Sequence, residues 1–430
     1  MAEVDGRWAT AVYLARGNLK MADLQIEHAT ATERKWAAAW ARSLALPRWL
    51  WLPLLLFALT RLGIALLVYL AIPLIPDSVT PPIYHLRPPD NILLDAFGSR
   101  WDTGFYVSIA EEGYQYEGVP LPSVAFFPLL PLLMRALTAF GGDAVTAGLF
   151  ISNAALALTA VLFYRLAEEQ WGTAVAERAI WYWLIFPTAF FGSAIYSESL
   201  FLLTAVGAFY AARRGYWEIA ALLGMLATLT RFVGLIIAPM LVVEWWMQRR
   251  LSWQNKPEGE RPSLLALLGL AIIPLGTGMY MAYLWRTFGD PLAFVHGAAA
   301  WQRVPQSPLI TIATLLQRPA EGWLAALWAG RLHIDNWLDF TFVLLFFVLG
   351  LVLLAKKRWS EAAFVLLGVL IPFSSGLLMS QRRYVWVLFP AFVLLAQWGK
   401  RPWLDKTINI FFLLGLALFS ALFANGYWVG

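Results

Sequence analysis

The sequence contains no cysteine, which excludes disulfide bonds, thiolate nucleophiles and cysteine-ligated metal sites. It contains only four histidines, and no two of them lie at the spacing of a metal-ligand pair. Charged residues make up only 14% of the chain, against about 25% in ordinary soluble domains, whereas hydrophobic residues reach 60%. This composition excludes a simple soluble globular enzyme and a disordered chain.

Long apolar stretches are what the sequence has in abundance. A spanning helix needs about 20 predominantly apolar residues, and the 23 tryptophans suit a protein that is anchored at two membrane–water interfaces. We therefore expect an all-α, multipass integral membrane protein with about 11 transmembrane helices. The predicted spans are 49–75, 145–165, 179–193, 196–212, 216–229, 232–247, 264–285, 338–355, 361–379, 383–399 and 407–425.

The basic residues predict the orientation of these spans, because cytoplasmic loops are rich in Lys and Arg. With residues 1–48 as a cytoplasmic N-terminal segment that is not a removable signal peptide, the basic clusters fall on the same side. These clusters are Arg213/Arg214, 249–261, Lys356–Arg358 and 400–406. Two long loops, 76–144 and 286–337, then lie outside the cytoplasm. Residues 49–430 are thus expected to form one membrane domain in the plasma (inner) membrane.

One apolar segment, 120–140, does not fit a simple crossing. Its prolines at 120, 122, 128 and 131 interrupt backbone pairing, which is tolerated at membrane depth only where protein or water satisfies the freed groups. We expect a re-entrant or interfacial helix. The alternative is a spanning helix paired with another span that the count above has missed.

The first outer loop holds the densest group of polar and aromatic residues, in which Asp102 follows Trp101. A carboxylate beside aromatic rings at a membrane surface is partly desolvated, which makes it a better base. Asp102 is therefore a candidate catalytic base. Equally, it could be the N-cap of a helix that starts at this point.

Charged residues at predicted outer helix ends are further candidates. Arg231, Arg382 and Arg383 could bind phosphate or could be interfacial cations. Arg61 lies within the first span, where pairing with Glu198 would account for it. Glu198 itself could face the site or only stabilise the first turn of its helix.

The loops offer weaker candidates. Glu117 and the pair Glu111/Glu112 are either solvated charges or ligands for sugar hydroxyls. Trp301 and Arg303 could stack on and clamp a substrate, or could anchor the loop at the interface. His296 is expected to be a hydrogen-bonded structural residue, and Asp290 before Pro291 indicates a turn.

Other chemistries have little support. The sequence has no GxxxxGK[ST] phosphate loop and no motif context for a Ser/His/Asp triad. Scattered basic residues are explained by orientation, so no nucleic-acid partner is expected. A multipass transporter of a lipid-linked or anionic solute remains an alternative, although no matched pair of interrupted helices is present.

Several motifs in the chain occur in a fixed order and resemble those of PIG-V-like mannosyltransferases, the family of GPI mannosyltransferase 2 and its prokaryotic relatives. The resemblance covers about residues 61–396. The motifs are Trp101-Asp102 with Phe105-Tyr106, Ala125–Pro128, Phe186–Phe191, Tyr196–Phe201, Leu226–Arg231, Gly289–Phe294, and Arg383-Tyr384 with Phe389-Pro390.

The resemblance implies the multipass fold of the C-type (GT-C) glycosyltransferases. It implies transfer of mannose, with inversion, from a polyprenyl-phosphate-mannose donor to a lipid or glycan acceptor outside the cytoplasm, without a metal or other cofactor. By motif match, Asp102 would be the base and Trp101 would shape the site. Tyr106, Glu117, Tyr196, Glu198, Trp301 and Arg303 would contact substrate, and Arg231, Arg382 and Arg383 would contact the donor phosphate.

Overall fold

The computed structural model describes residues 47–78, 84–85, 89–255, 262–317 and 319–430, without the side chains of 251–255. Most of the predicted cytoplasmic segment 1–48 lies outside these residues. Residues 55–430 form one compact unit, and the described residues before it, 47–54, contain the start of the first labelled helix.

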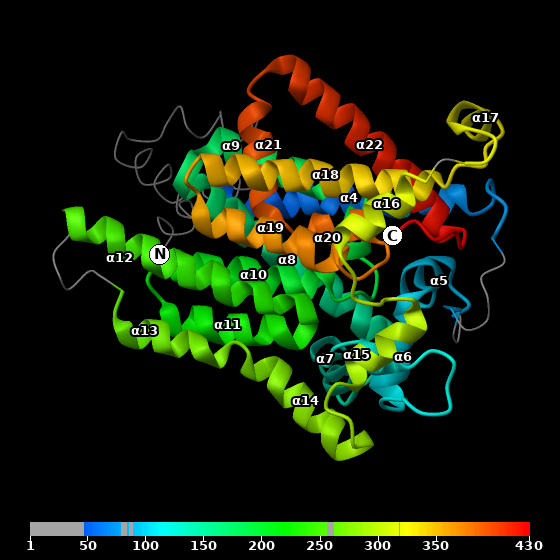
Figure 1. Ribbon diagram of the computed structural model, residues 1–430, viewed down its shortest axis with the longest axis horizontal. Coiled ribbons are helices and arrows are strands. Elements are labelled where there is room, and N and C mark those ends of the chain that lie inside the picture. The colour runs from blue at the N-terminus through cyan, green and yellow to red at the C-terminus, as the bar shows by residue number, and fades with distance from the viewer. Residues whose placement is uncertain (1–46, 79–83, 86–88, 256–261, 318) are drawn as a thin grey trace, which may run out of the picture. The chain divides into compact units, whose positions relative to one another are not determined.

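The described residues form helices and no named strand, so the predicted all-helical class is confirmed. A single isolated bridge joins His85 to Arg100. The α-helices, labelled in Figure 1, are α4 (Arg48–Ala71), α5 (Ile92–Gly98), α6 (Asp102–Glu111), α7 (Leu129–Thr138), α8 (Ala144–Trp171), α9 (Thr173–Leu184), α10 (Glu198–Arg213), α11 (Trp217–Thr230), α12 (Ile237–Asn255), α13 (Leu264–Gly269), α14 (Leu275–Phe288), α15 (Ala293–Ala298), α16 (Pro308–Leu315), α17 (Trp323–Trp328), α18 (Ile334–Ala355), α19 (Trp359–Phe373), α20 (Gln381–Trp386), α21 (Phe389–Trp398) and α22 (Pro402–Ala424).

Six helical segments of the described residues are long and apolar enough to cross a membrane, which confirms the predicted membrane-type composition. The other predicted spans are shorter or interrupted helices, so the number of crossings stays a prediction. The six segments are Arg48–Ala71, Ala144–Trp171, Phe232–Arg250, Leu264–Phe288, Ile334–Ala355 and Pro402–Ala424.

Two predicted spans are broken for a clear physical reason. The predicted span 179–193 ends as a helix at Leu184, shortly before Pro187, and 383–399 divides into α20 and α21 just before Pro390. Proline lacks a backbone N–H and pushes the preceding residue out of the helical region. The irregular segments that result carry residues of the site described below.

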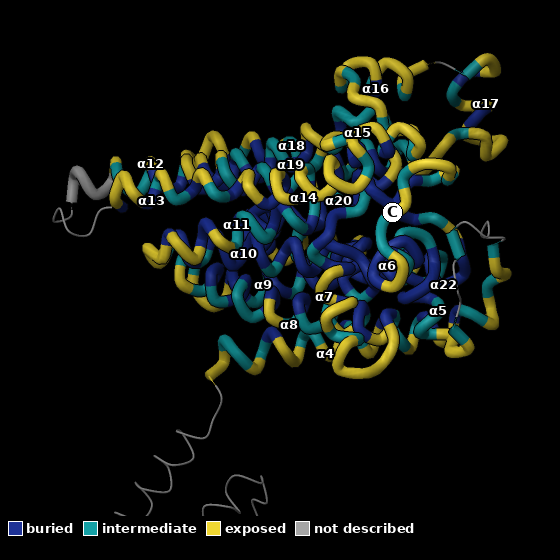
Figure 2. Tube along the Cα trace, turned by 90° about the horizontal axis from the view of Figure 1, so that it is seen from below, coloured by how far each residue is buried: buried dark blue, intermediate teal, exposed yellow. Residues whose placement is uncertain are grey.

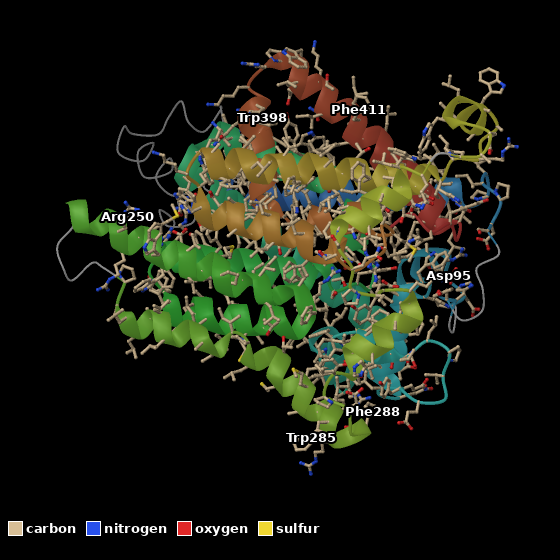
Figure 3. The ribbon with its side chains drawn as sticks, in the orientation of Figure 1. Asp95, Arg250, Trp285, Phe288, Trp398 and Phe411 are labelled. Atoms are coloured by element: carbon tan, nitrogen blue, oxygen red, sulfur yellow. The ribbon has the colours of Figure 1, made fainter. Side chains whose placement is uncertain are left out.

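The helices alternate in direction as the charge pattern predicted. At one end, Arg213 pairs with Glu244 at 2.8 Å, and the hydroxyl of Ser360 donates to the other oxygen of Glu244 at 2.7 Å. At the opposite end, α10 begins and α11 terminates, and there Glu198 pairs with Arg231. Figure 3 labels Arg250 of α12 and Asp95 of α5, which lie at opposite ends. Which end faces the cytoplasm stays a prediction.

The segment 120–140 contains only α7 and a short 3-10 turn, Ser123–Ala125. A ten-residue helix rises about 15 Å, roughly half of the hydrocarbon core. The alternative of a full spanning helix is therefore wrong for this segment. Leu130 and Met134 of α7 are fully buried against α6 and α8, so α7 supports the loop that carries Asp102.

The interior of the unit is formed by buried residues of α8, α9, α10, α20 and α21. Figure 2 shows the buried parts of the chain in dark blue. By contrast, α4 exposes large apolar side chains such as Leu62 and Leu66. A row of exposed leucines on a long helix is typical of a surface that contacts lipid. The packing of this interior fixes the irregular segments near Pro187 and Pro390, at the end of the unit where the site lies.

Candidate active site

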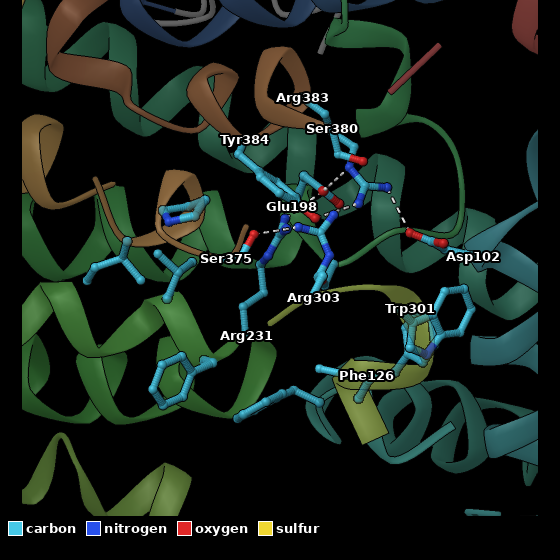
Figure 4. Close-up of a pocket in the computed structure, with 18 of the residues that line it drawn as sticks. Asp102, Phe126, Glu198, Arg231, Trp301, Arg303, Ser375, Ser380, Arg383 and Tyr384 are labelled. Carbon is cyan, nitrogen blue, oxygen red and sulfur yellow. Dashed lines mark hydrogen bonds and ion pairs between the residues drawn. The ribbon is translucent and has the colours of Figure 1, made fainter. Parts of the chain in front are cut away.

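A cavity of about 730 Å³ lies where the two long loops meet the ends of α10, α11 and α20 (Figure 4). Its wall contains nine of the residues predicted from the sequence. These residues are Trp101, Asp102, Tyr106, Tyr196, Glu198, Arg231, Trp301, Arg303 and Arg383.

Asp102 is held in the cavity by a contact that the sequence did not indicate. It is the first residue of α6, and its Oδ2 accepts a hydrogen bond from Nη1 of Arg383 at 2.8 Å. The N-cap alternative is wrong, because Trp101 holds that position. The second carboxylate oxygen, Oδ1, accepts no hydrogen bond from the residues that the structure describes.

Trp101 adopts a backbone conformation that is rare for a residue with a side chain, with φ 60° and ψ −129°. Strain of this kind persists only where the surroundings enforce it, and it gathers at functional sites. Here the backbone N–H of Trp101 donates to the carbonyl of Tyr84 at 2.6 Å. The indole contacts the rings of Tyr84 and Trp428, with centroids 5.3 and 5.1 Å away.

An ion cluster around the buried Arg100 fixes the position of this turn. Arg100 contacts Asp95 at 2.9 Å and Asp77 at 2.7 Å. Burial opposes the ionisation of Asp95, but hydrogen bonds from Ser99 and His85 and the charge of Arg100 outweigh it and lower the pKa of Asp95. The ionised carboxylate therefore anchors the segment that ends at Trp101 and Asp102.

Glu198 is almost fully buried at the start of α10, where it contacts two arginines. Its Oε1 lies 2.5 Å from Nη1 of Arg231 and 3.3 Å from Nε of Arg383. The predicted pairing with Arg61 is wrong. Arg61 instead donates to the carbonyls of Leu184 and Ala189 at 2.9 and 2.8 Å, because the end of α9 leaves carbonyls without helical partners.

Tyr384 was not predicted as a site residue, although it follows Arg383 in a motif noted above. Guanidinium groups of three arginines lie over its ring: Arg231 at 5.0 Å, Arg303 at 5.4 Å and Arg383 at 5.1 Å. The ring faces attract cations and so hold three like charges close together. The signal that could have revealed Tyr384 is its place beside a predicted site arginine.

Arg303 differs from the other two arginines. It donates to the hydroxyl of Ser375 at 3.1 Å and the carbonyl of Met379 at 3.3 Å, and no described carboxylate lies within 4.0 Å of it. The cavity wall thus contains three arginines and two carboxylates, Asp102 and Glu198, which leaves one positive charge in excess. A cavity with this charge and fixed guanidinium donors is suited to a phosphate group.

The remaining wall is aromatic and apolar. Trp301 packs edge-on against Phe105 and Phe126, with centroids 5.0 and 5.5 Å away. Tyr106 and Tyr196 are almost fully buried in the wall beside Glu198 and Arg383. Tyr84 and Trp428, which were not predicted, complete this side; no motif marked them, because they reach the cavity from distant segments.

Arg382 and Glu117 lie outside the cavity. Arg382 is fully buried on the other side of α20, where it donates to Asp335 at 2.9 Å and to the carbonyl of Val429 at 3.0 Å. Neither predicted role, phosphate ligand or interfacial cation, matches this position, because α20 points neighbouring side chains in different directions. Glu117 is exposed on a separate, smaller pocket of the loops. Glu111 and Glu112 are also exposed.

The predicted turn at Asp290 is present, because Oδ1 of Asp290 accepts a hydrogen bond from the N–H of Leu292 at 2.9 Å. His296 has the expected structural role, since its Nδ1 lies 2.7 Å from Oδ2 of Asp290. Tyr116 donates to the same oxygen at 2.9 Å and so links the first loop to the second. Among the described residues, no group of three or more His, Asp or Glu side chains is placed to hold a metal ion.

Residues 89–256 match the family model described as Mannosyltransferase (PIG-V). The match covers less than half of the chain. The predicted resemblance is thereby confirmed for these residues, and the matched family is one of glycosyltransferases, as predicted. The matched segment contains Asp102, Glu198 and Arg231, and it ends before Arg303 and Arg383.

The chain is also similar to solved structures of low sequence identity. The Archaeoglobus fulgidus oligosaccharyltransferase, in complex with Zn and sulfate, has a TM-score of 0.42 and 13% identity over 86% of this chain and 53% of its own. This chain therefore spans about half the length of that protein. ArnT from Cupriavidus metallidurans, bound to undecaprenyl phosphate, has a TM-score of 0.45 and 12% identity over 86% of this chain and 74% of its own. No curated protein sequence matches the chain.

Proposed function

We propose that this membrane glycosyltransferase transfers mannose from a polyprenyl-phosphate-mannose donor to a hydroxyl of a lipid- or glycan-linked acceptor on the extracytoplasmic face. The family match supports the mannosyl unit. The observation that carries the proposal is the cavity itself, in which the carboxylate of Asp102 shares one wall with an excess of arginine charge. A sugar phosphate placed there would meet a base and a phosphate site together.

The donor phosphate is assigned to Arg231 and Arg303. Both guanidinium groups line the cavity over the ring of Tyr384, and Arg303 has no described carboxylate partner. Apolar side chains next to them, Phe232 and Ile371, continue the wall and suit the first isoprene units of the carrier. The predicted role of Arg382 in phosphate binding passes to Arg303, because Arg382 does not line the cavity.

The reaction then needs no further group for charge balance. Asp102 accepts the proton of the acceptor hydroxyl while that oxygen bonds to C1 of the mannosyl unit. The bond between C1 and the phosphate oxygen breaks, and the polyprenyl phosphate leaves with the bonding electrons. Attack from the side opposite the phosphate inverts the configuration at C1. Fixed guanidinium groups stabilise the charge that develops on the leaving phosphate, which is the main source of rate enhancement at sites of this kind.

The test is transfer of radiolabelled mannose from polyprenyl-phosphate-mannose by the purified protein in detergent, with crude lipid and glycan extracts as acceptors. Transfer by the intact chain and its loss in Asp102→Asn would support the proposal. If no extract is labelled with this or any related donor sugar, the transferase proposal fails. Labelled donor crossing a sealed vesicle without transfer would instead favour the transporter.

A further inference from the structure

Glu198 and Asp102 compete for one guanidinium group. Nη1 of Arg383 contacts Asp102 at 2.8 Å, and Nε of the same side chain contacts Glu198 at 3.3 Å. Glu198 also pairs with Arg231 at 2.5 Å. The four side chains therefore form one chain of alternating charge, drawn with dashed lines in Figure 4, from the proposed phosphate site at Arg231 to the proposed base.

The pairs in this chain are close but poorly aligned. Oε2 of Glu198, Nη1 of Arg231 and Nε of Arg383 are buried, and none makes a hydrogen bond of good geometry with any described residue. A structural ion pair in a buried place is stable only when its hydrogen bonds are satisfied. Three such atoms are unsatisfied in this cluster. Binding of a further anion would therefore favour a rearrangement in which these atoms find partners.

We propose that Glu198 is a positioning residue that couples donor binding to the release of Asp102. The proposal rests on the function proposed above. A donor phosphate that pairs with Arg231 and Arg303 takes Arg231 from Glu198. Glu198 then keeps Arg383 as its only cation and draws it away from Asp102. Oδ2 of Asp102 becomes free for the acceptor hydroxyl only after the donor is bound.

The coupling must be reciprocal, because linkage between two binding events has the same magnitude in both directions. Removing the charge of Asp102 frees Arg383 for Glu198, which frees Arg231 for the phosphate. Asp102→Asn should therefore tighten the binding of undecaprenyl phosphate by about fivefold or more. This effect should be lost when Glu198 is replaced, since no carboxylate then connects the two arginines.

The experiment is a double-mutant cycle on the full chain in nanodiscs, with undecaprenyl phosphate as the probe and undecaprenol as the control for binding of the lipid tail. Dissociation constants are measured for the intact chain, Asp102→Asn, Glu198→Gln and the double variant. The expected result is tighter binding on Asp102→Asn in the intact background and a change of less than about twofold in the Glu198→Gln background. Glu117→Gln, an acid of the same loop outside the cavity, should leave binding unchanged.

An equal effect of Asp102→Asn in both backgrounds would overturn the proposal, because the charge of Asp102 would then act directly on the phosphate. Absence of undecaprenyl phosphate binding to the intact chain would also overturn it. If Glu198→Gln does not yield folded protein, Arg383→Lys takes its place: it keeps the charge, but a single ammonium cannot contact both carboxylates as the guanidinium does. The cycle needs no acceptor, so its failure is distinguishable from failure of the mannose-transfer assay.

Discussion

Arg383 donates a hydrogen bond to Asp102 at 2.8 Å, although the two residues are 281 positions apart in the sequence. The same guanidinium lies over the rings of Tyr196 and Tyr384 and contacts Glu198. A cation that is almost fully buried among aromatic rings is costly unless it is paired, and this pairing fixes the position of the candidate base. The first turn of α20 thus positions both carboxylates of the cavity, Asp102 and Glu198.

Asp102→Asn should abolish mannose transfer, with a loss of at least about 100-fold, because the amide cannot accept the proton of the acceptor hydroxyl. Binding of the donor should persist. The measurement is the initial rate of labelled-mannose transfer, with Asp90→Asn as the control, since Asp90 lies in the same loop outside the cavity. Retention of more than a tenth of the activity would show that Asp102 is not the base.

Arg303→Gln should weaken donor binding by about tenfold or more, because a hydrogen bond to a charged group contributes about 1.5–3 kcal/mol. Arg331→Gln is the matched control, because Arg331 lies in the same long loop, 286–337, and pairs with Glu321 at 2.8 Å outside the cavity. Titration of both variants with undecaprenyl phosphate gives the comparison. Equal affinities for the two would remove Arg303 from the phosphate site.

Trp101 offers a test of backbone strain. At φ 60° and ψ −129° a side chain costs about 1–3 kcal/mol, and glycine avoids this cost. Trp101→Gly should therefore be more stable than Trp101→Ala, although both lose the ring contacts with Tyr84 and Trp428. Melting temperatures in detergent measure the difference. A more stable alanine variant would contradict the strained conformation.

Acid should destabilise the first long loop, 76–144, through Asp95. The pKa of Asp95 is lowered in the folded protein, because the hydrogen bonds of Ser99 and His85 and the charge of Arg100 outweigh its burial. The stabilisation is therefore complete above the unfolded value, 3.8, and is lost as the pH falls through the lower folded value. As the pH falls from the unfolded value to the folded one, the melting temperature of the intact chain should fall more steeply than that of Asp95→Asn. Parallel curves would argue against the ion cluster.

Arg382→Gln should lower the stability of the folded protein without changing the donor site. Its removal leaves the buried Asp339 without the charge of Arg382, which lies 3.7 Å away, and breaking such a pair costs about 3–5 kcal/mol. The expected result is a lower melting temperature with donor affinity unchanged in the folded fraction. Arg401→Gln, at an exposed position, is the control. Lower donor affinity at full stability would restore the phosphate role predicted from the sequence.

Apolar run length and the distribution of basic residues predicted the membrane class and the alternation of the helices, because both depend on composition along the chain. The first-loop motif also identified Asp102 and Trp101 as part of one wall. The interruptions near Pro187 and Pro390 were readable in principle, since proline acts locally. They were missed because hydropathy alone does not register a missing backbone donor.

The sequence by itself determined which residues are apolar, where cations gather and which motif lies in the first loop. Only the tertiary structure decided which arginine meets which acid. Arg382 and Arg383 are neighbours, yet one contacts Asp335 and the other Asp102. Side chains on a helix point about 100° apart from one residue to the next, so their partners depend on how helices pack. Tyr384 and Trp428 line the cavity for the same reason, because contacts between distant segments arise only when the chain is folded.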